Sequence, residues 1–200
     1  MNDYRPGWIL LGQYPFGDPD GVGSWLIHHG KEAALLELPP DKQLIHDAVK
    51  AIADLGVTVK FIFVSHDHED HFDPVILRSL QRKPAFRAAT WIPSKSGHRG
   101  ITQLDLAGEP LWLVHAPKHS LTDTVTVFRG VAMTGDFELG IIGSVNREIG
   151  KKMKRESLAF LAAFERNHGY HIHTLMSAHL NDFRQNFNWP NVVLGEVDTP

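Results

Sequence analysis

The chain has 200 residues, of which 42% are hydrophobic and 22% are charged, and its formal net charge is −3. This length suits one domain with a substantial hydrophobic core, so we expect residues 1–200 to form a single domain. The slightly negative charge does not favour a nucleic-acid partner. No apolar run reaches the roughly 18 residues of a membrane span, and the amino terminus does not have the pattern of a signal peptide. We therefore expect a cytoplasmic protein without a membrane partner.

The histidine and cysteine counts restrict the chemistry. The chain contains 13 histidines and no cysteine. Without cysteine there are no disulfides, thiolate ligands or cysteine nucleophiles, so a transition-metal site must be built from imidazole and carboxylate groups. Histidine is the commonest protein metal ligand, and the positions of the histidines decide which of them are candidates.

Hydrophobic patterns in the first part of the chain predict a strand-rich start and two helices. Short strands are expected at 8–11, 24–28 and 33–37, followed by an amphipathic helix over 41–55 that stops before a glycine. Residues 57–64 are mostly β-branched and aromatic, which is typical of a strand buried on both faces. Asp73 and Pro74 then suit the N-cap and first position of a helix through about Leu80.

The rest of the chain alternates short strands with one clear helix. Strands are expected at 86–92, 111–115, 124–128, 131–133 and 173–176, and a helix is expected over roughly 155–167. Residues 93–100 form the most loop-like stretch. Strands grouped with separated helices indicate a layered α/β protein in which polar residues gather at strand ends.

A dense group of metal-binding residue types follows the predicted buried strand. His66, His68, Asp70 and His71 lie within six residues of one another. Alternate side chains of an extended segment point to the same side, so His66 and His68 can bind one metal together. Asp70 and His71, beyond a bend, can reach a second ion nearby. A solvated polar loop would explain a random pair of histidines, but the full pattern favours a metal site.

The His-x-His-x-Asp-His pattern resembles that of the metallo-β-lactamase superfamily, whose α/β fold is a four-layer αββα sandwich with one or two metals at the edge of its β-layers. The resemblance implies further ligands in later motifs. The sequence supplies them in the expected order, in Ala116-Pro117-Lys118-His119-Ser120, Thr134-Gly135-Asp136 and Ser177-Ala178-His179. Because the agreement extends from about Ser24 to His179, it implies one metallo-β-lactamase-like domain.

The resemblance also implies a division of the ligands between two metals. His66, His68 and His119 would form the first metal site, Asp70, His71 and His179 the second, and Asp136 would bridge the two. Two divalent ions are the expected cofactors, with zinc as the first choice and iron or manganese also compatible with imidazole and carboxylate ligands. A metal-bound hydroxide would attack the substrate. Asp70 is also the expected catalytic residue, because it could orient this hydroxide.

Some residues depart from the pattern of the family or lie outside it. Lys118 stands where the family commonly has glycine, and we expect it to be solvated rather than to contact an anionic substrate. The segment 36–40 replaces a stretch that often contains aspartate. Surface, loop or structural roles are expected for the histidines outside the motifs: His28, His29, His46, His98, His171 and His173.

The residue expected to bridge the two metals limits the classes of reaction that the resemblance implies. An aspartate such as Asp136 is typical of the thioesterase, lactonase and phosphodiesterase branches, whereas enzymes that act on β-lactams place Cys or Ser there. The predicted function is therefore metal-dependent hydrolysis of a small ester, thioester, lactone or phosphodiester, with a small molecule as the partner; a homodimer is compatible with the sequence. Two alternatives remain open: an iron-dependent oxidoreductase of the same fold, similar to sulfur dioxygenases, and a non-catalytic metal-binding module.

Overall fold

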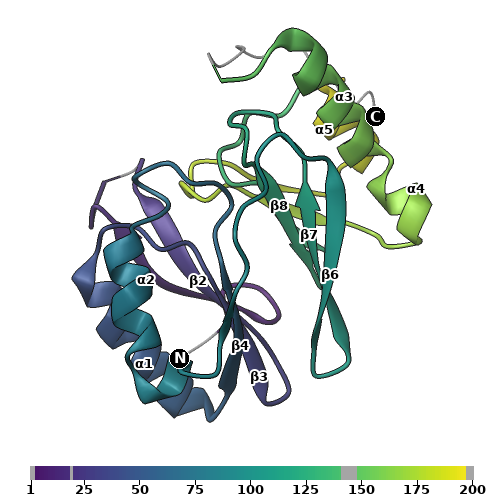
Figure 1. The fold of residues 1–200 in the computed structure, drawn as a ribbon. Coiled ribbons are helices and arrows are strands. Elements are labelled where there is room, and N and C mark those ends of the chain that lie inside the picture. Colours follow the sequence, from purple (N-terminus) through teal and green to yellow (C-terminus); the bar gives the residue numbers. More distant parts are fainter. Residues whose placement is uncertain (1–2, 19, 141–147, 197–200) are drawn as a thin grey trace.

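Two β-sheets lie face to face and helices cover their outer surfaces, which gives four layers (Figure 1). The computed structural model describes residues 3–18, 20–140 and 148–196. The first sheet and the helices on it come from the amino-terminal half of the chain, and the second sheet and its helices come from the carboxy-terminal half. This arrangement confirms the predicted αββα sandwich.

The first sheet combines an antiparallel start with parallel strands. Its strand order is β1-β2-β3-β4-β5, and β3, β4 and β5 run parallel. Helices α1 and α2 connect these parallel strands and cover the outer face of the sheet. The elements of this half are β1 (Trp8–Tyr14), β2 (Val22–His29), β3 (Glu32–Leu36), α1 (Lys42–Leu55), β4 (Thr58–Phe63), α2 (Pro74–Gln81) and β5 (Thr90–Trp91).

Both helices of the first half begin directly after an aspartate that caps them, and α1 also ends at the glycine that its sequence predicts. The side chain of Asp41 accepts a hydrogen bond from the backbone N–H of Gln43, and Asp73 accepts one from Val75. Helix α1 stops at Gly56, whose φ of 61° is the left-handed conformation that glycine adopts without strain. The start of α2 matters for the site, because this helix fixes the far end of the loop that carries His66 to His71.

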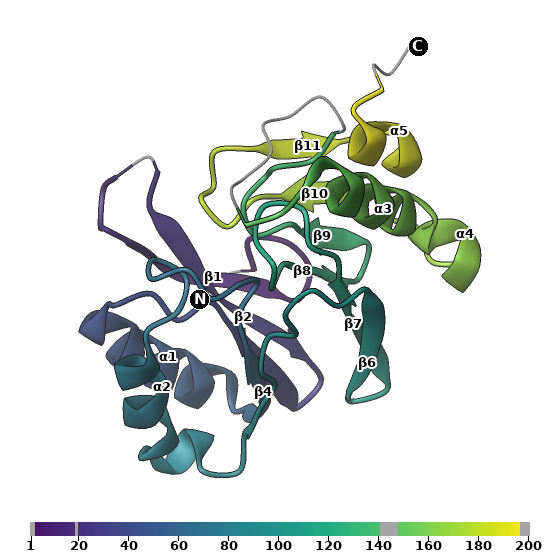
Figure 2. The ribbon, with the colours of Figure 1, turned by 45° about the horizontal axis from the view of Figure 1, so that its top comes forward.

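The second sheet is antiparallel except where β9 and β10 run parallel. Its strand order is β11-β10-β9-β8-β7-β6, and α3 and α5 pack together over its outer face (Figure 2). The elements of this half are β6 (Gly100–Leu106), β7 (Glu109–His115), β8 (Thr124–Phe128), β9 (Val131–Met133), α3 (Lys151–Ala162), α4 (Phe164–His168), β10 (Thr174–Met176), β11 (Phe183–Gln185) and α5 (Trp189–Leu194).

Two predicted elements are wrong in extent. The strand expected at 86–92 is only β5, because a 3-10 turn at Pro84–Phe86 carries Phe86 into the core before the strand begins. The helix expected at 155–167 begins earlier, at Lys151, and is divided at Ala163 into α3 and α4. In addition, β6, β11 and α5 were not predicted.

Successive side chains of the central strands point to opposite faces of their sheet and so pack against different layers. In β3, Ala33 and Leu35 pack toward α1, whereas Ala34 and Leu36 pack against the second sheet. A third cluster lies between the second sheet and α3 and α5 and includes Val125. Burying a leucine side chain contributes about 2 kcal/mol, so the three clusters hold the strand ends rigidly in place.

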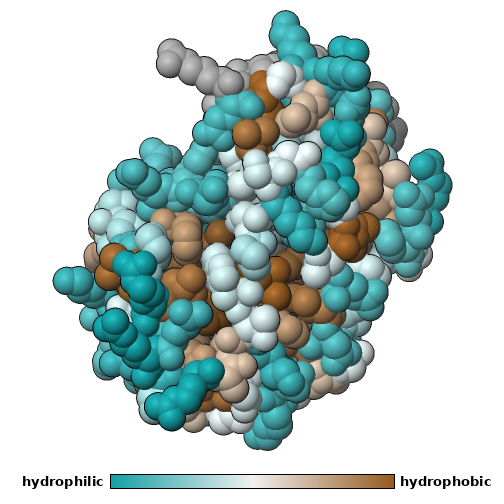
Figure 3. Space-filling model, viewed as in Figure 1, coloured by the Kyte–Doolittle hydropathy of each residue, from teal (hydrophilic) through white to brown (hydrophobic). Residues whose placement is uncertain are grey.

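The outer surface is mostly hydrophilic in the view of Figure 3, and hydrophobic residues are visible mainly between the two halves of the molecule. None of the helices in the described part of the chain is long and apolar enough to cross a lipid bilayer.

Candidate metal centre

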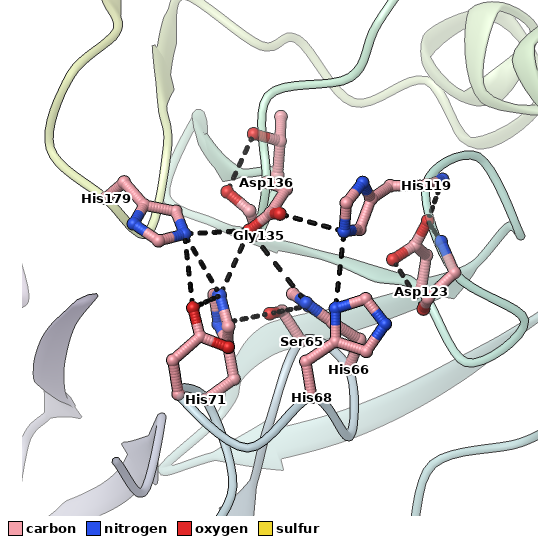
Figure 4. Close-up of polar contacts among 12 residues, drawn as sticks. Ser65, His66, His68, His71, His119, Asp123, Gly135, Asp136 and His179 are labelled. Atoms are coloured by element: carbon pink, nitrogen blue, oxygen red, sulfur yellow. Dashed lines mark hydrogen bonds and ion pairs between the residues drawn. The ribbon is translucent and has the colours of Figure 1, made fainter. Parts of the chain in front are cut away.

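The candidate ligands lie in loops that follow strands of both sheets, and their side chains face one another (Figure 4). Strand β4 of the first sheet leads into the loop with His66 to His71. In the second sheet, β7 leads into the loop with His119, β9 leads into Asp136, and β10 leads into His179. Loops after strand ends are the usual place for ligand sites in open α/β sheets, because the sheets hold them rigidly while leaving them accessible.

The structure brings all seven predicted ligands together in three overlapping groups. Within each group, one nitrogen or oxygen atom per residue lies within 4.8 Å of the corresponding atoms of the others. The histidines outside the motifs belong to none of these groups within the described ranges. The groups are His66, His68 and His119; His66, His71 and Asp136; and Asp70, His71 and His179.

Asp136 lies at the centre of the cluster, and its two oxygens face different neighbours. Oδ1 is 3.0 Å from Nε2 of His71 and 3.1 Å from Nε2 of His179. Oδ2 is 2.9 Å from Nε2 of His119. The carboxylate therefore contacts candidate ligands of both expected sites, and Nε2 of His66 also lies 3.9 Å from Oδ1.

The cluster contains a buried nitrogen atom that a metal ion would satisfy. Nε2 of His66 is buried and has no hydrogen-bond partner among the described residues. A buried polar atom without a partner is uncommon and needs an explanation. Because this atom is surrounded by the imidazole and carboxylate groups of the other candidates, the donor set is suitable for a divalent ion.

The electrostatics of the cluster are dominated by Asp136. Burial lowers the pKa of His71, but the carboxylates of Glu37 and Asp136 outweigh burial and raise this pKa to about 10. Hydrogen bonding to Asp136 also raises the pKa of His119 and of His179. Burial alone would raise the pKa of Asp136, but its contacts with these histidines hold that pKa well below its usual range. In the absence of a metal, protons therefore compensate the charge of the carboxylate.

Zinc binding is consequently expected to release protons, and zinc affinity is expected to rise with pH. A ligating imidazole nitrogen must be deprotonated, whereas His71, with a pKa of about 10, carries its proton at neutral pH. Calorimetric titrations in two buffers of different ionisation enthalpy would count the released protons. In Glu37→Gln the pKa of His71 should fall and fewer protons should be released. Heats that do not depend on the buffer would contradict this prediction.

Glu37 is a site residue that the sequence did not identify. It is fully buried, its Oε1 lies 3.4 Å from Nδ1 of His71, and its Oε2 accepts a hydrogen bond from the backbone N–H of Ser65. A carboxylate on the far side of a ligating imidazole fixes the orientation of the ring. The available signal was the position of this carboxylate at the carboxyl end of the strand predicted at 33–37.

Lys118 is buried, so the prediction that it is solvated is wrong. Its Nζ donates a hydrogen bond to the backbone oxygen of Asp136 at 2.6 Å and lies 3.8 Å from Oδ2 of Asp123. Asp123 is itself buried and accepts hydrogen bonds from the backbone N–H groups of Lys118, His119 and Ser120. The lysine turns inward because this buried carboxylate and a backbone carbonyl both attract a cation. Lys118 and Asp123 thus join the His119 loop to the Asp136 loop.

Lys118→Met should destabilise the metal-free protein by about 3 kcal/mol, because it leaves the backbone oxygen of Asp136 without its donor and the charge of Asp123 less compensated. Urea denaturation would measure the change. Lys152→Met is the control, since the side chain of Lys152 on α3 is 90% exposed, and its effect should stay within about 0.5 kcal/mol. Equal stability of the two variants would contradict a structural role for Lys118.

Gly135 permits the close approach of Asp136 to the first sheet. Its φ is 70°, and a Cβ atom at this position would lie only 2.7 Å from Oγ of Ser65. A larger residue would therefore be strained and would push the Asp136 loop away from His66.

A pocket beside the cluster could admit a small molecule. Its volume is about 560 Å³, and Asp136 and His179 form part of its wall. A slightly larger pocket of about 600 Å³ lies between α1 and α2. The pocket beside the cluster is the candidate substrate site, because two candidate ligands form part of its wall. The other residues that line it are Asp20, Phe137, Glu138, Leu139 and Asn181.

The fold is similar to those of solved metallo-β-lactamase structures. A metallo-β-lactamase family protein from Thermus thermophilus aligns with a TM-score of 0.59 at 16% sequence identity, over 94% of this chain and 77% of that chain. ETHE1 from Myxococcus xanthus aligns with a TM-score of 0.61 at 16% identity, over 88% and 81%. The DIM-1 metallo-β-lactamase aligns with a TM-score of 0.62 at 12% identity, over 96% and 91%. The sequence matches no protein-family model and no curated protein. The chain therefore has the metallo-β-lactamase fold, as its motifs predict.

Proposed function

We propose that this chain is a metal-dependent hydrolase that cleaves a small ester, thioester, lactone or phosphodiester. The observation that carries the proposal is the convergence of seven imidazole and carboxylate side chains from loops of both sheets, one of which, Asp136, contacts His71, His119 and His179. Three histidine nitrogens lie within about 3 Å of this one carboxylate. Solvated loops are not expected to hold such an arrangement, because protonated imidazoles that share a partner repel one another.

We assign His66, His68 and His119 to the first ion, Asp70, His71 and His179 to the second, and Asp136 to both, with zinc as the first choice of metal. When bound, such ions would activate a water molecule as the nucleophile and stabilise negative charge on the substrate. The side chains of the protein would supply the remaining chemistry.

Asp70 is the candidate for handling the proton of the attacking water. Its side chain is 51% exposed, while its Oδ2 lies 3.7 Å from Nε2 of His71 and equally far from Nε2 of His179. One carboxylate oxygen thus faces the cluster from its open side. In this position Asp70 would accept a hydrogen bond from the water and orient it toward the substrate.

The pocket beside Asp136 and His179 favours a small substrate. A volume of about 560 Å³ is within the usual range for small-molecule sites. Phe137 and Leu139 supply an apolar surface for an acyl or alkyl group, and Asn181 supplies an amide for hydrogen bonding. We expect thioesters, lactones and phosphodiesters to be better substrates than β-lactams, because an aspartate occupies the bridging position.

A substrate screen with separately loaded metals tests the proposal. Purified protein reconstituted with zinc, manganese or iron would be assayed against matched panels of thioesters, lactones and phosphodiesters, with oxygen consumption followed in parallel. We expect metal-dependent hydrolysis that a chelator abolishes and zinc restores. Oxygen consumption by the iron form without hydrolysis would instead support the oxidoreductase alternative, and metal binding without either activity would support a non-catalytic module.

A further inference from the structure

The two ring nitrogens of His68 face different partners. Nδ1 lies 3.3 Å from Nε2 of His119 and so faces the ligand cluster (Figure 4). Nε2 lies 3.1 Å from Oε1 of Glu148, a residue that is 80 positions away in the chain. A neutral imidazole carries its proton on only one nitrogen, so a carboxylate at Nε2 favours the tautomer that leaves the lone pair of Nδ1 free.

We propose that Glu148 is a positioning residue of the first metal site. It accepts the Nε2–H of His68 and thereby holds the ring so that Nδ1 is available to an ion shared with His66 and His119. A carboxylate behind a ligating imidazole also makes the ligand more basic. The inference rests on the metal site of the proposed function, but it does not depend on which substrate is hydrolysed.

Three other histidines of the cluster also have partners at their outer ring nitrogens. Nδ1 of His71 faces the fully buried Glu37, Nδ1 of His66 lies 3.0 Å from Oγ of Ser65, and Nδ1 of His179 is hydrogen-bonded to the backbone oxygen of Asp20. Glu148 differs because its side chain is 43% exposed. It can therefore be replaced with little risk to the fold.

The position of Glu148 is set by the second half of the molecule rather than by the loop that carries His68. Glu148 lies two residues before Gly150, the N-cap of α3, and α3 is fixed by Leu158 and Leu161 in the core beneath it. The carboxylate is thus presented to His68 from a helix start that is anchored elsewhere.

The test compares zinc binding by Glu148→Ala and Glu148→Gln with a matched control. Glu156→Gln is the control, because the side chain of Glu156 on α3 is 41% exposed and pairs with Arg99 at 2.8 Å, outside the ligand groups. Competition with a chromophoric chelator measures the affinities of the two zinc ions. We expect Glu148→Ala to weaken one ion by roughly 10–100-fold, Glu148→Gln to weaken it less because the amide oxygen still accepts the Nε2–H, and the control to behave as the wild type.

Long-range ¹H–¹⁵N spectra of the imidazole rings identify the site that is affected. In the zinc-loaded wild type, His68 should carry its proton on Nε2 in slow exchange with water. In Glu148→Ala this proton should exchange faster, and the signals of His68 and His119 should lose their zinc-bound shifts at lower chelator concentrations than those of His179. A purely structural effect would not select these two rings.

Three results would overturn the inference: wild-type affinity for both ions in Glu148→Ala, equal weakening of both ions, or a loss in Glu156→Gln that matches the loss in Glu148→Ala. Each of them would leave the proposed function standing, since the wild type would still bind two ions. Failure of the wild type to bind zinc, manganese or iron would instead overturn the proposed function, and the inference with it.

Discussion

Replacing Asp136 with alanine is expected to empty both metal sites, so that zinc content after dialysis falls from near two ions per chain to well under one. The reason is geometric, because Oδ1 of Asp136 faces His71 and His179 while Oδ2 faces His119. The substitution also removes the negative charge that would hold two divalent ions close together. Elemental analysis after reconstitution measures the loss, and hydrolysis of any substrate from the screen should disappear with it.

Two further variants make this result specific. His179→Ala should lose mainly the second ion and keep the first, because His179 lies in the group with Asp70 and His71. Asp54→Ala should keep both ions, since Asp54 lies on α1 and pairs with Lys50 at the surface. If Asp136→Ala and His179→Ala both retain two tightly bound ions, the assignment of the ligands is wrong.

Asp70→Asn is expected to lower the turnover rate by on the order of 10²-fold or more. Asparagine keeps the volume of aspartate but is a weaker metal ligand and a poorer proton acceptor. Because Asp70 is 51% exposed, the change should leave the fold intact. Steady-state kinetics with a substrate from the screen would separate the expected fall in kcat from a smaller change in KM.

The matched control for Asp70 lies in the same loop. Glu69 is an exposed carboxylate next to Asp70 and belongs to none of the candidate metal groups within the described ranges. Glu69→Gln removes the same charge from the same loop and should change the turnover rate by less than about threefold. Equal losses in the two variants would show that the loop charge, rather than Asp70 itself, supports the reaction.

The sequence predicted the cluster of candidate ligands because its signals are local and ordered. Four candidate ligands lie within one short loop, and each later ligand follows a recognisable strand end. Helices α1 and α2 were predictable for a similar reason, since Asp41 and Asp73 cap them through contacts two residues away. Patterns of this kind require no knowledge of which strands pair.

Residues that support the cluster could not be predicted, because their partners are distant in the sequence. Glu37 contacts His71 because β3 and β4 are parallel neighbours, and the hydrogen bond of Lys118 is accepted by the backbone of Asp136, 18 positions away. Strand β11 was not predicted for another reason. All three residues of β11 are exposed, so no hydrophobic pattern marked this strand.

The division of the ligands between the two sheets affects the order of events in folding. His66, His68, Asp70 and His71 lie in a loop that follows a strand of the first sheet, whereas His119, Asp136 and His179 lie in loops that follow strands of the second. Each proposed ion therefore needs ligands from both halves and can bind tightly only after the sheets have docked. If docking is late in folding, zinc stabilises the native state more than the transition state. Zinc would then slow unfolding and leave the refolding rate nearly unchanged. It would hold together two halves of the molecule that assemble without it.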